Sequence, residues 1–162
     1  MELMDSLFEV QDPHPDVFDL LTASFHTFCR VPAKNVARTF ELKLFQRIGW
    51  LPELTRCVSC GTKQWNAVYF SARHGGLLCE ACDRDEIRTI PLSRNTVQTL
   101  QVLIEKTFAE AAAWAYSVQT EHELERVTSR FLQFRLEYPL NTPHFLNEIS
   151  EVSQFPKAVQ TF

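Results

Sequence analysis

Two pairs of cysteines restrict what the middle of this chain can fold into. Cys57 and Cys60 form one Cys-x-x-Cys pair, Cys79 and Cys82 form a second, and eighteen residues lie between the pairs. A tetrahedral zinc ion takes four ligands, with thiolate sulfurs about 2.3 Å away, and a two-residue gap lets both sulfurs of one turn face one ion. We therefore expect a structural Zn²⁺ site formed by all four cysteines, within a small zinc ribbon.

The residues between the pairs favour a ribbon. They are enough for two short strands, which we place at residues 68–70 and 77–78. Gly61 suits the first turn because glycine readily adopts the positive φ that leaves backbone N–H groups aimed at sulfur. His74 can be read as a further ligand, but the sequence His74-Gly75-Gly76 is more typical of an exposed hairpin turn.

The rest of the sequence disfavours most other uses of four thiols. Two disulfides need an oxidising compartment, whereas the first residues lack the basic start and apolar core of a signal peptide, and Cys29 makes the cysteine count odd. A redox-active pair normally lies in a thioredoxin-like βαβ setting, which the pattern does not predict. Iron–sulfur ligation stays open as an alternative. Cys29 is expected to be a small buried side chain rather than a nucleophile.

Composition and motifs narrow the function classes. The chain has 162 residues, 45% hydrophobic and 22% charged, which indicates a globular protein. Four glycines against eight prolines argue against a glycine-rich nucleotide-binding fold. No apolar run approaches the roughly 18 residues of a membrane-spanning helix, so we expect no membrane association. We also expect no enzyme activity, because catalytic motifs are lacking and four thiolates leave a zinc ion no open position.

Outside the ribbon the apolar residues recur at helical spacing, so we predict a mostly α, bundle-like helical domain with an inserted four-cysteine zinc ribbon of small β structure. Residues 1–49 and 91–150 are expected to form the helical domain, residues 50–90 the ribbon, and residues 151–162 a mobile tail. The expected core positions are Val17, Leu20, Leu21, Phe25 and Phe28; Ala37, Phe40, Leu44 and Ile48; Val97, Leu100, Ile104 and Phe108; and Leu124, Val127, Phe131, Phe134 and Tyr138.

Capping signals divide these helices. Residues 91–93 are expected to cap one helix, and Thr120 with Glu123 predicts a capping box at the start of another. A last short helix is expected to begin around Thr142 and Pro143, since proline is favoured at the first helical position.

The charge is distributed unevenly. The net charge is −4, but residues 1–29 carry −6, residues 30–94 carry +5 and residues 95–162 carry −3. The middle segment is the candidate surface for a polyanion, although so small an excess also fits an ordinary mixed surface. The candidate DNA- or partner-binding residues are Lys34, Arg38, Lys43, Arg47, Arg56, Arg73, Arg84 and Arg88, with Lys63 and Arg94 in the same segment.

We expect this chain alone to bind DNA weakly. A few scattered Arg and Lys side chains imply about two to four phosphate contacts, whose contribution falls steeply with salt. Trp50, Trp65, Tyr69 and Phe70 flank the cysteines and are suited to stacking on bases, but we expect them to pack the ribbon instead.

Three segments resemble one bacterial family. They are Phe40-Glu-Leu-Lys-Leu-Phe-Gln-Arg-Ile-Gly-Trp-Leu-Pro-Glu-Leu-Thr-Arg-Cys-Val-Ser-Cys-Gly61, Tyr69-Phe-Ser-Ala-Arg-His-Gly-Gly-Leu-Leu-Cys-Glu-Ala-Cys82, and Leu136-Glu-Tyr-Pro-Leu-Asn-Thr-Pro-His-Phe-Leu146. They are similar, in order, to the helix and first zinc knuckle, the second knuckle and the closing helix of RecO, a recombination mediator. The resemblance spans nearly everything up to about residue 150.

The resemblance implies a DNA repair and recombination mediator that is cytoplasmic and associated with the nucleoid. Members bind single- and double-stranded DNA, anneal strands, engage RecR and the tail of single-strand-binding protein, and help load RecA. The family places an OB-fold before this region. The sequence has none, so we expect a C-terminal fragment or a shortened product whose strand annealing is impaired.

The tail of single-strand-binding protein is acidic and ends in an apolar residue, so we expect it to bind an apolar pocket rimmed by basic side chains. The expected rim residues are Lys34, Arg38, Lys43 and Arg47, with Lys34 and Arg38 exposed on one helix. The alternative function is a stand-alone zinc-ribbon adaptor for protein interaction or transcription.

Overall fold

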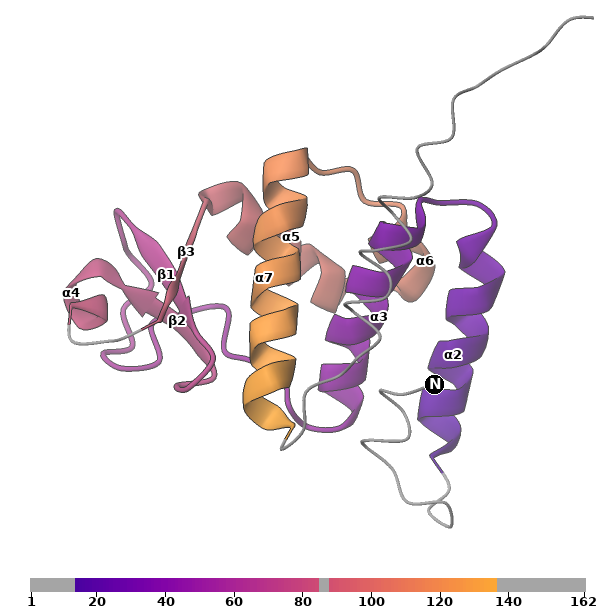
Figure 1. Ribbon diagram of the computed structural model, residues 1–162, viewed down its shortest axis with the longest axis horizontal. Helices are drawn as coiled ribbons and strands as arrows, with labels where there is room; N and C mark the ends of the chain where they lie inside the picture. The colour runs from indigo at the N-terminus through magenta and orange to yellow at the C-terminus, as the bar shows by residue number, and fades with distance from the viewer. Residues whose placement is uncertain (1–13, 85–87, 137–162) are drawn as a thin grey trace, which may run out of the picture. The chain divides into compact units, whose positions relative to one another are not determined.

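The computed structural model describes residues 14–84 and 88–136, and it confirms a mostly helical fold with a small antiparallel sheet and a four-cysteine cluster (Figure 1). The helices are α2 (Pro15–Phe28), α3 (Ala33–Arg47), α4 (Glu80–Asp83), α5 (Arg94–Glu105), α6 (Phe108–Ala112) and α7 (Val118–Arg135). The strands are β1 (Val68–Ser71), β2 (Gly76–Cys79) and β3 (Ile90–Leu92). None of the described helices is both long enough and apolar enough to cross a membrane.

The hairpin predicted between the cysteine pairs is confirmed. β1 and β2 pair antiparallel, with Ser71 opposite Gly76, and the turn between them contains Gly75 at a φ of +70°. His74 is exposed in that turn, and its backbone N–H donates to Ser71 Oγ. β3 was not predicted. It adds to the other side of β1, giving the order β2-β1-β3, and a proline in its centre is tolerated because it is an edge strand.

The helical core forms where α3 meets α5 and α7. The aromatic rings of Phe45, Phe131 and Phe70 are fully buried and pack edge to face, with ring centroids 5.2 Å apart for the first pair and 5.9 Å for the second. Because these residues belong to α3, α7 and β1, the Phe131 ring of α7 contacts both the Phe45 ring of α3 and the Phe70 ring of the sheet. Edge-to-face aromatic pairs of this kind add to the stabilisation that burial alone supplies.

The chain enters and leaves the ribbon through short, tied connections. After α3, the backbone N–H of Trp50 donates to the Phe45 carbonyl at 2.7 Å, and the Gln101 side chain of α5 donates to the Leu54 carbonyl at 2.7 Å. At the exit, Ser93 follows β3 directly and caps α5, since its Oγ accepts from the Thr96 N–H at 3.2 Å. The cap expected near residues 91–93 is therefore confirmed.

The expected core face of α2 is only half right. Val17 and Leu20 are buried, but Phe25 and Phe28 are 73% and 55% exposed, and Cys29 is exposed rather than buried. α2 contacts α3 and α6, and these neighbours cover a single stripe of its surface. The apolar pattern of α2 is wider than that stripe, so spacing alone could not show which apolar residues face inward.

α3 also buries a different set of residues from the one expected. Leu44 is buried as predicted, whereas Ala37 and Phe40 are half-buried and Ile48 lies after the helix ends. α3 packs against α2, α5, α6 and α7, so it is covered on several sides. Its buried residues are Val36, Thr39, Leu42, Lys43, Leu44 and Phe45.

The stripe expected from Val97 to Phe108 is broken into two helices. α5 ends at Glu105, and Leu103 is buried where Ile104 was expected. α6 begins one residue after Thr107, which forms a capping box with Glu110. This capping box was missed.

The capping box expected at Thr120 and Glu123 is wrong. α7 begins at Val118, and the Thr120 N–H donates to Ser117 Oγ at 3.1 Å. Glu123 instead accepts from the Ser93 N–H at 2.7 Å, which ties α7 to the start of α5.

Within α7, Leu124, Val127 and Phe131 are buried as predicted, but Phe134 is 53% exposed. Tyr138, the helix expected near residue 142 and the tail expected to be mobile lie outside the described residues.

Candidate metal centre and basic surfaces

The four paired cysteines come together at the tip of the ribbon. Their sulfur atoms all lie within 4.8 Å of one another, and the Sγ atoms of Cys60 and Cys79 are 3.7 Å apart. A tetrahedral ion with sulfur ligands about 2.3 Å away requires sulfur–sulfur separations of roughly 3.8 Å. The four cysteines therefore lie close enough to bind one metal ion.

Local backbone structure positions each pair. Around the first pair, the Gly61 N–H donates to the Cys57 carbonyl at 2.8 Å, and Gly61 has the expected positive φ of +75°. The second pair begins at the end of β2 and ends in α4, so the hairpin carries Cys79 to the first turn. The Cys79 N–H then lies 3.5 Å from Cys57 Sγ, a backbone donor aimed at sulfur.

The thiols affect one another's ionisation. Burial raises the pKa of Cys57, but N–H groups of Cys60, Cys79 and Ser59 more than offset this and bring the pKa to about 6. Ser59 lowers the pKa of Cys82, yet the three neighbouring thiols outweigh it and raise the pKa to about 12. Four thiols at this distance favour full ionisation only when a cation balances their charge, and thiolates are the form that binds metal.

Two of the four aromatic residues beside the cysteines pack the ribbon as expected, and the other two contact α7. Phe70 is fully buried, and Trp65 and Tyr69 pack against the cluster of Cys57, Leu78 and Cys79. Trp50 is half-buried, with the Arg135 guanidinium 5.9 Å from its ring centroid.

Two of the four expected rim residues are engaged inside the helical domain. Arg38 is only 16% exposed, so its expected exposure is wrong; it pairs with Glu41 at 2.9 Å and donates to Thr128 Oγ1 at 2.7 Å. Burial raises the pKa of Glu41, and the Arg38 charge opposes that rise.

Lys43 is buried rather than at a rim, and its ammonium donates to the carbonyls of Ile104 and Lys106, the latter at 2.6 Å. Burial and the neighbouring Arg47 charge lower the pKa of Lys43. Side-chain spacing along α3 could not reveal the Lys43 contacts, because the accepting carbonyls lie at the end of α5.

The other candidates are either ion-paired or exposed. Lys34 forms an ion pair with Glu121 of α7, and Arg56 pairs with Glu53 at 3.0 Å. The remaining exposed candidates are Arg47, Lys63, Arg73, Arg84, Arg88 and Arg94.

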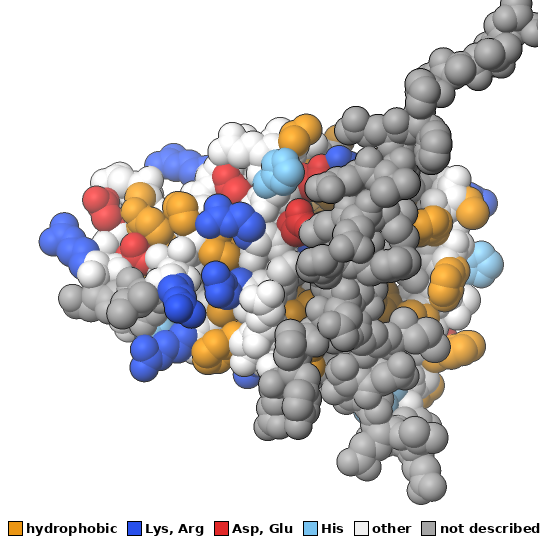
Figure 2. Space-filling view, in the orientation of Figure 1, with side chains coloured by type: hydrophobic (Ala, Val, Ile, Leu, Met, Phe, Trp, Pro, Cys, Tyr) orange, Lys and Arg blue, Asp and Glu red, His pale blue; other side chains and the backbone are white. Residues whose placement is uncertain are grey.

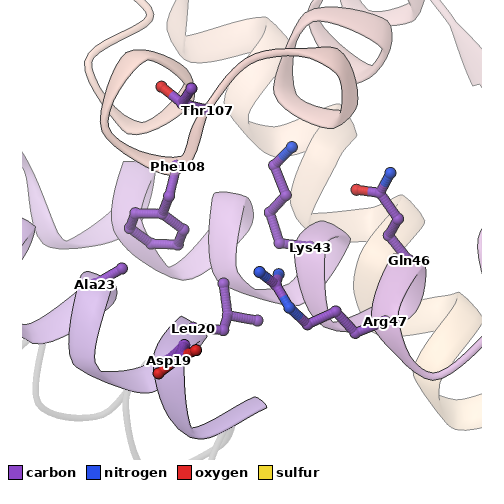
Figure 3. A pocket seen from close by; sticks show the side chains of 8 residues that line it. All are labelled: Asp19, Leu20, Ala23, Lys43, Gln46, Arg47, Thr107 and Phe108. Carbon is purple, nitrogen blue, oxygen red and sulfur yellow. The ribbon is translucent and has the colours of Figure 1, made fainter. Parts of the chain in front are cut away.

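Lys43 and Arg47 do meet at one hollow. It has a volume of about 530 Å³ and lies between α2, α3 and the start of α6. Figure 3 shows Leu20 in the middle of this space, with Phe108 above Ala23 and the Arg47 guanidinium directed toward Leu20. Asp19 adds one carboxylate to the α2 side. The hollow combines apolar walls with an exposed guanidinium.

A second basic hollow was missed. It has a volume of about 320 Å³ between β3 and α7, and its lining includes Arg88, Arg126 and Arg130. The sequence does contain a signal for it, since two arginines four residues apart lie on one face of a helix. The pairing of that face with Arg88 depends on the sheet packing beside α7, which the sequence does not indicate.

Comparison with known proteins identifies the family of this chain. Residues 1–144 match the family described as "Recombination protein O C terminal". Proteins named DNA repair protein RecO are similar as well. That of Desulforamulus reducens is 29% identical over 149 residues, which are 91% of this chain and 58% of that protein. That of Anaeromyxobacter dehalogenans is 33% identical over 150 residues, which are 91% of this chain and 59% of that protein. The chain thus spans a little over half the length of these relatives. It belongs to the RecO family and corresponds to the C-terminal region of its members.

Proposed function

We propose that this chain is the C-terminal part of a RecO-type mediator that assists RecA loading and strand annealing, in the bacterial cytoplasm at the nucleoid. The observation that carries the proposal is the family match over residues 1–144. The chain contributes through binding, to RecR, to single-strand-binding protein and weakly to DNA, and we assign it no catalytic step.

The test is a pull-down with RecR and the single-strand-binding protein tail, comparing this chain with the same chain fused to an OB-fold. We expect both forms to retain a partner and the fused form to anneal DNA strands better. Failure of both forms to retain either partner would contradict the mediator function and leave the zinc-ribbon adaptor as the alternative.

We propose that the cysteine cluster holds one structural Zn²⁺. The supporting observations are the four sulfurs within 4.8 Å and the backbone N–H directed at Cys57 sulfur. With four thiolate ligands the ion has no open position for water, so it would organise the ribbon and supply no catalysis. Binding free energy of a structural zinc ion is also folding free energy for the loops that carry its ligands.

Elemental analysis tests the zinc site. The purified wild-type chain should contain about one zinc per chain, as four-thiolate stoichiometry requires, and the Cys79→Ser, Cys82→Ser double variant should contain almost none. Cys29→Ser is the matched control, because Cys29 is exposed and distant in sequence from the pairs. Unchanged metal content in the double variant would contradict the assignment of Cys79 and Cys82 as zinc ligands.

For the acidic tail of single-strand-binding protein we propose the hollow between α2, α3 and α6. Leu20 and Phe108 supply apolar walls for a terminal apolar side chain, and Arg47 supplies an exposed charge for its carboxylate. Lys34 and Arg38 do not line this hollow, and the Lys43 ammonium there already serves the α5 carbonyls. Arg47 is therefore the rim residue to test.

Fluorescence anisotropy with a labelled tail peptide measures this directly. Arg47→Glu should weaken binding at least tenfold, as expected when a charge that pairs with a carboxylate is reversed. Lys63→Glu changes the charge by the same amount on the ribbon and should have little effect. Equal weakening by both variants would indicate that net charge, rather than this hollow, governs binding.

A further inference from the structure

The exposed face of α7 beside the ribbon is a continuous row of hydrogen-bond donors. Arg126, Ser129, Arg130 and Gln133 follow one another at intervals of three, one and three residues, which places them on a single helix face. All four line the hollow of about 320 Å³ between β3 and α7. No acidic residue is among the described residues that line this hollow; Glu123, three residues before Arg126 on the same helix face, accepts from the Ser93 N–H.

The ribbon supplies the opposite wall. Arg88, Thr89 and Ile90 lead into β3 and line the same hollow. Arg88 has a φ of +72° and is the only non-glycine residue with a positive φ in the ranges 14–84 and 88–136. Such backbone conformations are costly for side chains other than glycine and tend to persist at functional sites, where surrounding structure enforces them.

The three guanidinium groups retain their hydrogen-bonding capacity. Within the described part of the chain, Lys34, Arg38 and Arg56 each pair with a glutamate, whereas Arg88, Arg126 and Arg130 make no ion pair. In Figure 2, Lys and Arg side chains gather over the part of the surface where β3 and α7 lie in Figure 1. The hollow thus presents three positive charges together with neutral hydroxyl and amide donors.

These groups select a ligand by its chemistry. A guanidinium fork matches the paired oxygens of a phosphate, and Ser, Thr and Gln side chains are common neutral donors to phosphates. An acidic peptide that ends in an apolar residue needs an apolar pocket, which the hollow at Leu20 and Phe108 offers and this one does not. We propose that the β3–α7 hollow binds consecutive phosphates of one nucleic-acid strand.

This proposal rests on the proposed DNA-repair function and names the site that contacts the backbone. It predicts binding without base preference, because phosphate contacts carry no sequence information. It also predicts a definite salt dependence, since each neutralised phosphate of a single strand contributes about −0.7 to the slope of log K against log salt.

The test is fluorescence anisotropy of a labelled single-stranded oligothymidine with the zinc-loaded chain, titrated between 25 and 200 mM salt. The Arg126→Gln, Arg130→Gln variant removes two phosphate contacts, so its slope should be about 1.4 smaller and its affinity at 50 mM salt roughly 50-fold lower than wild type. The matched control is Arg30→Gln, Lys106→Gln, which removes two exposed charges on the helical side and should change affinity less than threefold. Circular dichroism and zinc content verify that each variant is folded.

The outcomes separate the two proposals. If both double variants weaken binding equally, the β3–α7 hollow is not the nucleic-acid site, and the proposed DNA-repair function is unaffected. No detectable wild-type binding at the lowest salt would overturn the hollow and the DNA-binding part of the proposed function together, while RecR and tail binding are scored independently. Displacement of the oligothymidine by a polyglutamate of equal charge, at equal concentration, would show a general anion surface and overturn the assignment to nucleic acid.

Discussion

Replacing Lys43 with methionine should destabilise the helical domain far more than an ordinary surface lysine substitution. Lys43 is 8% exposed, and its ammonium donates to the carbonyls of Ile104 and Lys106 where α5 ends. The last carbonyls of a helix have no partner within the helix, and a positive charge there also interacts favourably with the helix dipole. Lys43→Met keeps the aliphatic packing and removes both hydrogen bonds.

The magnitude follows from those two bonds. A hydrogen bond to a charged group contributes about 1.5–3 kcal/mol, and removal of the burial penalty on the ammonium offsets part of the loss, which leaves about 2–4 kcal/mol. The matched control is Lys34→Met. Lys34 is 53% exposed and makes one ion pair with Glu121, a class of interaction that contributes about 0–1 kcal/mol.

Urea unfolding followed by circular dichroism in zinc-saturated buffer measures both variants. Lys43→Met should lower the unfolding free energy by at least about 2 kcal/mol with an unchanged slope, whereas Lys34→Met should stay within about 1 kcal/mol of wild type. If the two variants lose equal stability, the α5 carbonyls do not depend on Lys43 and the reasoning fails.

Three further substitutions test other contacts. Burial raises the folded-state pKa of Glu41, so the contribution of this side chain to stability is full below pH 4.5 and is lost as the pH rises through the folded-state pKa. Glu41→Gln removes this loss. Thermal unfolding from pH 4 to 8 should therefore show the variant gaining stability relative to wild type as the pH rises. A constant difference across that range would contradict this. Phe131→Ala removes both edge-to-face contacts and should cost about 3–5 kcal/mol in urea unfolding, against less than about 1 kcal/mol for the exposed Phe134→Ala. Gly76→Ala would place a Cβ 2.5 Å from a backbone oxygen and should lower the free energy of unfolding by about 3 kcal/mol. The Cβ of Gly49→Ala would meet no atom within 4 Å, so this variant should lose only the positive-φ strain of about 1–2 kcal/mol. Equal losses of unfolding free energy would show that the contact at Gly76 relaxes freely.

The sequence predicted local features well and long-range ones poorly. Cysteine spacing, the turn at Gly75 and the cap at Ser93 were correct because each is set by residues close together in the chain. Phe25 was placed in the core and is exposed, since helical spacing shows that a residue is apolar without showing which neighbour covers it.

The candidate binding residues show the same limit. Arg38 was expected at the surface, yet its charge pairs with Glu41 and reaches Thr128 of another helix. Arg126 and Arg130 were overlooked because they belong to a segment with net negative charge, where segment averages conceal a local row of arginines. Only the packing of α7 beside β3 brings them to Arg88.

The short, tied connections of the ribbon affect how this region can vary in length. Trp50 and Leu54 are hydrogen-bonded to α3 and α5 at the entrance, and Ser93 at the exit directly follows β3 and caps α5. An insertion directly after Ser93 would separate this cap from α5, and an insertion before Leu54 would strain the hydrogen bond that its carbonyl accepts from Gln101. A change of length at either connection therefore disturbs α5 as well as the ribbon, which couples the length of these segments to the packing of the helical domain.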